Sequence, residues 1–167
     1  MEVEDAVVRI KNAGHDISNE YATDRCIAFL NNSIQQIAGL LVTMRYPQIV
    51  QSTTLRTGDT LPKNFIRTAG TYPIRITNGK VDIVNDAENV TVRYFATPTL
   101  VETTKDKMPY EHDGINEIIV RGAILLALNE NEYDITQDNA LYNNLQQAIA
   151  GGIIDNFGSA GTQQQNA

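Results

Sequence analysis

The feature that most constrains this chain is a long apolar seam at helical spacing between Thr23 and Tyr46. Apolar residues recur three and four positions apart, the pattern of a helix packed nearly parallel to its neighbours in a bundle. Pro47 ends this helix, because the residue before a proline is pushed out of the α region. Gly39 in its middle predicts a close crossing with another helix. The seam consists of Ile27, Leu30, Ile34, Ile37, Leu41 and Met44.

Three further segments have the pattern of helices. Glu2 to Ala13 is a short amphipathic helix, and a last helix begins at Asp134 with a capping-box-like start. Between them, Asp113 is the expected N-cap of a helix that runs to Leu128. That helix is apolar around most of its circumference, which indicates burial on several sides or a contact between subunits. Gly122 within it predicts a second close crossing.

The middle of the chain changes from helical spacing to the alternation of strands. Strands are expected at Ile49 to Thr57 and at Val90 to Ala96, with a hairpin at Thr71 to Val84 between them. Asn78-Gly79 is the strong signature of a two-residue type I′ turn. These segments predict a small antiparallel meander of up to four strands. The expected hairpin register pairs Thr77 with Lys80, Ile76 with Val81, Arg75 with Asp82 and Ile74 with Ile83.

Composition excludes some classes of protein. The 167 residues include 20 acidic and 13 basic side chains, a net charge of -7. This argues against a nucleic-acid-binding protein, whose affinity comes largely from Lys and Arg. The single cysteine, Cys26, forms no internal disulfide and is expected to be buried. Because no stretch resembles a membrane span or a signal peptide, we expect a soluble protein that is made in a cytoplasm and binds no membrane.

No motif for catalysis is present in the sequence. It has no phosphate-binding glycine loop, no His-Glu-x-x-His and no nucleophile elbow. We therefore predict no enzyme, no catalytic residue, no metal and no cofactor. Three groups of polar residues are alternatives to this prediction. They are a His15-Asp16 pair on a loop, a metal cluster of Glu111, His112 and Asp113, and a glycosidase pair of Glu102 and Glu117.

Together these signals predict a mainly α fold, a helical bundle with an inserted small antiparallel β meander and an extended C-terminal tail. The tail has no large apolar residue after Phe157, so it cannot order itself by burial. The expected parts are the first bundle helices (1–46), the β insertion (47–98), a connecting loop (99–112), a C-terminal helical hairpin (113–157) and the tail (158–167).

Several local strings, in this order of elements, resemble the head–tail adaptor (connector) proteins of tailed bacteriophages. The resemblance spans about Val8 to Ile149. The strings are Ala13-Gly14-His15-Asp16, Tyr21-Ala22-Thr23-Asp24, Phe29-Leu30-Asn31, Leu61-Pro62-Lys63-Asn64-Phe65, Tyr72-Pro73-Ile74 with Asn78-Gly79, and Val92-Arg93-Tyr94-Phe95, followed by the C-terminal helical hairpin.

The resemblance implies a structural virion protein of the neck, assembled as a ring, usually of twelve copies. Its partners would be copies of itself, the portal protein above and a tail or nozzle protein below. DNA would pass through the ring without sequence-specific binding. For such a ring we predict partner-binding residues at the hairpin turn and in the tail, where Phe157 would be an apolar anchor. They are Asn78, Gly79, Phe157, Thr162, Gln163, Gln164 and Gln165.

Two other functions stay open. One is a phage-encoded cell-wall glycan hydrolase, which would work as a monomer and need one essential carboxylate. The other is a monomeric acidic inhibitor of a host protein. The mass of the assembly separates both from the adaptor.

Overall fold

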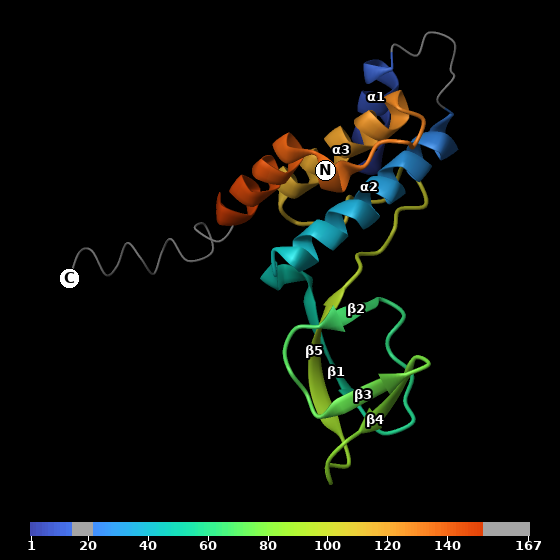
Figure 1. The fold of residues 1–167 in the computed structure, drawn as a ribbon. Coiled ribbons are helices and arrows are strands. Elements are labelled where there is room, and N and C mark those ends of the chain that lie inside the picture. The colour runs from blue at the N-terminus through green and yellow to red at the C-terminus, as the bar shows by residue number, and fades with distance from the viewer. Residues whose placement is uncertain (15–21, 152–167) are drawn as a thin grey trace, which may run out of the picture. The chain divides into compact units, whose positions relative to one another are not determined.

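The computed structural model describes residues 1–14 and 22–151, and this part of the chain has a mixed α/β fold. Four helices make it 47% helical, and 19% is strand in two small antiparallel sheets. The predicted mainly α bundle is therefore wrong. The elements in chain order are α1 (Val3–Ala13), α2 (Thr23–Thr43), η1 (Pro47–Ile49), β1 (Val50–Leu55), β2 (Phe65–Thr68), β3 (Ile74–Thr77), β4 (Lys80–Ile83), β5 (Val90–Ala96), α3 (Asp113–Leu128), η2 (Ile135–Gln137) and a last helix over residues 139–151 (Figure 1).

The chain divides into two compact units. Met1–Leu40 and Thr99–Ala167 form the first, which we call the helical unit, and Leu41–Pro98 form the second, the β unit. The strands all belong to the β unit, whose residues pair and pack among themselves. This is the physical reason that the bundle prediction failed: the middle of the chain has a core of its own.

The helical unit is built around apolar faces of α1, α2 and α3. The seam on α2 is buried as predicted, with Leu30, Ile34 and Ile37 at 0% exposure. Cys26 is also buried. Most of α3 is covered within this unit, because its sequence is apolar around most of the helix. By length and composition α2 would also suffice to cross a membrane, but most of it is buried in the protein, as in the core helix of a soluble domain.

One of the two predicted close crossings is confirmed. A Cβ added to Gly122 of α3 would lie 2.5 Å from Ser33 Oγ on α2 and 2.7 Å from Ile135 Cδ1. The buried Ser33 hydroxyl donates a hydrogen bond to the Ile119 carbonyl oxygen at 2.7 Å. The prediction for Gly39 is wrong, since a Cβ there meets no atom within 4 Å.

Amide side chains attach the irregular segments of the helical unit to its helices. Asn31 of α2 donates to and accepts from the Val101 backbone, at 2.8 and 2.9 Å. Asn116 of α3, which is fully buried, makes the same two-way contact with the Tyr110 backbone at 2.6 and 3.3 Å. Each amide satisfies a backbone donor and acceptor that would otherwise lack partners.

Two predicted helix starts are wrong. The N-cap of α3 is His112, whose Nδ1 accepts from the Gly114 N–H at 3.0 Å, and Asp113 is the first helical residue. Asp134 caps the short η2, while the last helix begins later, where Asp138 accepts from the Leu141 N–H at 2.9 Å. Both errors arise because several residues close together in the sequence can each cap a helix.

The β unit contains two sheets, with strand orders β1-β5-β2 and β3-β4. The hairpin register is confirmed at all four pairs. The predicted meander is wrong, because β5 lies between β1 and β2 instead of continuing from the hairpin. The segment that contains Gly58 and Leu61 runs along the other side of β4, through backbone hydrogen bonds to Val81 and Gly79.

One core cluster of the β unit lies between its two sheets. Leu55, Val81 and Val92 are buried together, one from each of β1, β4 and β5. Partly buried hydrophobic residues pack around them, namely Leu61, Tyr72, Ile74 and Val90. The hairpin thus stacks its aliphatic face on the larger sheet, which explains why its register tolerates no slip.

Candidate functional site

The predicted partner-binding residues fall in two places. Asn78 and Gly79 form the tip of the β3–β4 hairpin, with φ angles of 52° and 73°, as a type I′ turn requires. Both are exposed, and Ile76 beside them is 41% exposed. The tail residues Phe157 and Thr162 to Gln165 lie outside the described residues.

The candidate metal cluster does not come together as a site. His112 uses Nδ1 to cap α3, and Asp113 lies 3.3 Å from the N-terminal amine of Met1. Within residues 1–14 and 22–151, no group of three or more His, Cys, Asp or Glu side chains is placed to hold a metal ion. The His15-Asp16 pair lies outside the described residues.

Of the two glycosidase candidates, Glu102 is exposed and Glu117 is held by an arginine. Both of its carboxylate oxygens accept hydrogen bonds from Arg9 of α1, each at 2.8 Å. This bond lowers the pKa of Glu117 below its ordinary value. A general acid for glycoside cleavage needs the opposite shift, so the contact gives Glu117 a structural role between α1 and α3.

Charge is divided unequally between the two units. Residues 41–98 carry seven Lys and Arg against four Asp and Glu, a net charge of +3. The remainder of the chain carries six Lys and Arg against sixteen Asp and Glu, a net charge of -10. The overall charge of -7 therefore hides a basic unit and a strongly acidic one, and each can attract the other unit of a different molecule.

The outer face of the larger sheet carries hydroxyl groups and arginines. Directly opposed residues in an antiparallel pair lie on one side of the sheet, so Ser52 and Thr54 share a face with Arg93 and Thr91. All four are exposed. Arg67 joins them from β2, with its guanidinium 5.5 Å from the centre of the Phe95 ring. We call Ser52, Thr54, Arg67, Thr91 and Arg93 the arginine face.

The residues of this face differ in how far they are engaged. Thr54 and Thr91 hydrogen-bond to each other at 3.1 Å, and Arg67 donates to the Val42 carbonyl oxygen at 3.3 Å. The Arg93 guanidinium has no hydrogen-bond or ion-pair partner among residues 1–14 and 22–151. Arg93 is thus the cation on this face that is available for an outside anion.

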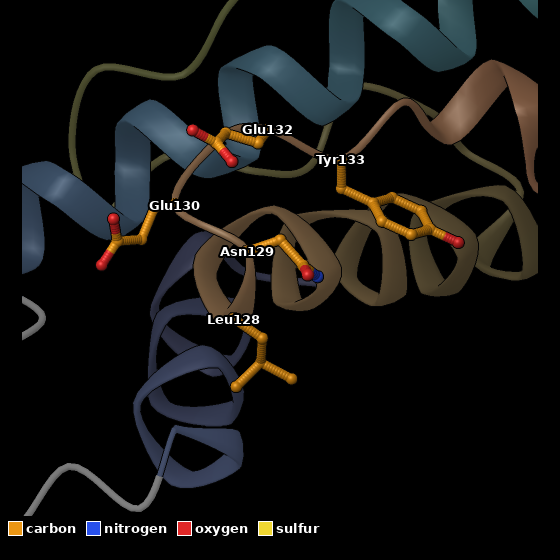
Figure 2. Close-up of a pocket in the computed structure, with 5 residues that line it drawn as sticks. All are labelled: Leu128, Asn129, Glu130, Glu132 and Tyr133. Atoms are coloured by element: carbon orange, nitrogen blue, oxygen red, sulfur yellow. The ribbon is translucent and has the colours of Figure 1, made fainter.

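A pocket of about 430 Å³ lies at the end of α3, in the helical unit. Figure 2 shows that its walls come from the last turn of α3 and the turn that follows it. Leu128 is 53% exposed there, although large apolar side chains are usually covered. Glu130 and Glu132 are exposed and make no side-chain hydrogen bond or ion pair within the described part of the chain. We call residues 128–134 the acidic turn.

The backbone holds this turn in a set conformation. Glu130 and Asn131 have φ angles of 53° and 67°, in the left-handed region that non-glycine residues seldom adopt. The Asn131 N–H donates to Leu126 at 2.8 Å and the Asn129 side chain donates to Leu125 at 2.7 Å, both at carbonyl oxygens of α3. The open carbonyls at the helix end are thus satisfied, and both glutamates remain exposed.

Two further acidic side chains near this pocket are already engaged. Asp134, at the end of the acidic turn, accepts hydrogen bonds from the Thr136 backbone N–H and hydroxyl. Tyr133 donates a short hydrogen bond to Asp138, which lowers the pKa of Asp138 and raises the pKa of Tyr133. Asp138 also accepts from the Leu141 N–H. The available anions of the turn are therefore Glu130 and Glu132.

Sequence reasoning missed both surfaces. The run of hydroxyl residues in β1, from Ser52 to Thr54, was a usable signal for an exposed sheet face. The pairing that brings Arg93 between the hydroxyls of β1 and Arg67 of β2 is long-range, so local pattern could not reveal it. Glu130 and Glu132 resemble any polar turn in the sequence.

A scan against protein-family models finds no match to this chain, and a search of curated proteins finds none either.

Proposed function

We propose that this chain is a structural subunit of a virion neck, a head–tail adaptor that forms a ring, of twelve copies, between the portal and the tail of a bacteriophage. The observation that carries the proposal is the division into two units of opposite charge, each with an exposed charged side chain that lacks a partner in the described chain: Arg93 in the β unit, and Glu130 and Glu132 in the helical unit. Such a molecule is equipped to join other protein surfaces.

The order of elements supports the same function. Two helices precede the strands and helices return after them, which is the layout that the resemblance to adaptor proteins implies. Two different surfaces on one molecule make a head-to-tail contact, and a head-to-tail contact whose rotation closes gives a ring. Repetition of a modest contact around that ring makes the whole assembly stable.

The charge also suits the passage of DNA. Each copy contributes a net charge of -7, so a ring presents a predominantly negative assembly to the phosphate backbone. Repulsion disfavours the phosphate contacts that account for nonspecific binding to DNA. Genome passage without sequence-specific binding is the expected consequence.

The glycan hydrolase is less well supported. Its best candidate carboxylate, Glu117, has a lowered pKa and bonds to Arg9 through both oxygens. A catalytic acid in that position would have to break this contact in each cycle. We therefore favour a structural function.

The mass of the assembly tests the proposal. The full chain is co-expressed with the portal protein of the same phage, and the complexes are sized by sedimentation and imaged by electron microscopy. We expect a ring with rotational symmetry, and a dodecamer has twelve times the 18.5 kDa mass of the chain. Isolated copies without symmetry, or a chain that stays monomeric beside the portal, would exclude the adaptor and favour the monomeric inhibitor.

A further inference from the structure

We propose that the arginine face of one copy binds the acidic turn of the next copy, with Arg93 paired to Glu130 and Glu132. This inference rests on the proposed function, since it names the contact that would build the ring. The two surfaces lie in different units of the chain. In a head-to-tail assembly, a pair of copies leaves one free surface of each kind. Further copies can then add until the ring closes.

Charge complementarity identifies a second copy as the occupant. The arginine face belongs to a unit of net charge +3, and the acidic turn belongs to the part of the chain with net charge -10. Arg93, Glu130 and Glu132 are all exposed, and their side chains lack hydrogen-bond or ion-pair partners within the described residues. A guanidinium can bind a carboxylate through two parallel hydrogen bonds, which fixes orientation as well as affinity.

The neutral groups of the two surfaces also match. The hydroxyls of Ser52 and Thr54 flank the arginine and can donate to carboxylate oxygens. On the other side, Leu128 is 53% exposed at the edge of the turn. Contact with a sheet face would cover it, and removing this apolar side chain from water favours association.

Preorganisation lowers the cost of such a contact. The arginine face lies on paired strands, and Arg67 is fixed by its stack on Phe95. The acidic turn is held by backbone and side-chain hydrogen bonds to the end of α3. Little main-chain freedom is lost when such surfaces meet, so more of the interaction energy appears as affinity.

Charge reversal in trans tests this contact. One variant carries Arg93→Glu, and a second carries Glu130→Lys together with Glu132→Lys. Self-association of each purified full-length chain is measured by sedimentation over a concentration series at low salt. We expect each variant alone to lose at least about tenfold in the association constant, because like charges then face each other.

A mixture of the two variants should recover association. The reversed face of the first meets the reversed turn of the second, and the remaining contact is the wild-type one. Alternating assemblies with an even number of copies are expected, and higher salt should weaken them as it weakens the wild type. A contact between units within one chain would give no such recovery on mixing.

Matched controls separate the contact from general charge and folding effects. Lys63→Glu makes the same charge change at an exposed site of the β unit outside its strands, and the pair Glu102→Lys and Glu111→Lys does so in the helical unit. Both should associate as the wild type does. Melting curves followed by circular dichroism confirm that all variants fold.

Three outcomes would overturn the contact, and they differ in what they imply for the ring. If Arg93→Glu assembles normally while wild-type rings form, the ring stands and this contact is overturned. If the wild-type chain does not associate with itself or with the portal, the proposed function and the contact both fall. If Arg93→Glu still self-associates but no longer binds a duplex DNA probe that the wild type binds, the arginine face binds nucleic acid and the proposal is overturned.

Discussion

The two units of this chain are stabilised in different ways. The helical unit buries long apolar faces of α1, α2 and α3 and attaches its irregular segments through Asn31 and Asn116. The β unit packs two small sheets together through Leu55, Val81 and Val92, and its hairpin depends on a type I′ turn. Packed helix faces tolerate little change in shape, whereas a tight turn depends on backbone conformation at a few positions. The units also carry opposite net charge. A ring contact that joins the β unit of one copy to the helical unit of the next would therefore need both units to be folded.

The largest effect is expected from a substitution in the helical unit, where α2 and α3 cross closely at Gly122. Gly122→Ala places a Cβ within 2.5 Å of Ser33 Oγ and 2.7 Å of Ile135 Cδ1. Ser33 must move and weaken its buried hydrogen bond to Ile119. We expect a loss of about 1–3 kcal/mol in the free energy of unfolding, measured by urea denaturation.

The matched control is the same substitution at Gly39, a helical glycine with open space around it. Gly39→Ala meets no atom within 4 Å, so it should stabilise α2 by about 0.5–1 kcal/mol through lower backbone entropy in the unfolded chain. Equal effects of the two substitutions would contradict the close packing at Gly122.

A smaller effect is expected from breaking the β unit at its turn. Replacing Asn78-Gly79 by Ala-Ala places alanine at positive φ in both positions. Because Asn78 is already an L-residue at positive φ, most of the added cost arises at Gly79 and is about 1–2 kcal/mol. Hydrogen exchange should become faster in β3 and β4, while exchange in α1, α2 and α3 is unchanged. Asn89→Ala, in an exposed turn of the same unit, is the control. Faster exchange in the helices as well would mean that the two units unfold together.

The smallest effect concerns the surface contact between α1 and α3. The side chains of Arg9 and Glu117 are 39% and 46% exposed, so solvent screens the pair and Arg9→Gln should cost below about 1 kcal/mol. Because Arg9 lowers the pKa of Glu117, the stabilisation is present above the unfolded pKa and is lost as pH falls through the folded one. Thermal melts should therefore show a difference at neutral pH that disappears in acid. A difference that persists in acid would show that the lost side-chain packing, not the ion pair, is responsible.

Elements with a strong local signal were predicted well. The seam of α2, the helix ending at Ala13, the strand Val90–Ala96 and the full hairpin register all follow from residue spacing and turn chemistry. The candidate surfaces were not predicted, because exposure of Arg93, Glu130 and Glu132 without partners depends on which segments lie beside them. The proposed contacts at the hairpin turn and in the tail remain predictions.

What the sequence determined by itself was local: periodicity of 3.6 or 2, the Asn78-Gly79 turn, and the excess of acidic over basic residues. Tertiary structure decided everything that depends on distant pairing. It placed β5 between β1 and β2, gave the middle of the chain its own core, and made a close crossing of Gly122 but not of Gly39. It also separated a basic unit from an acidic one. The physical reason is that local propensity acts over a few residues, whereas burial and strand pairing join residues that are tens of positions apart.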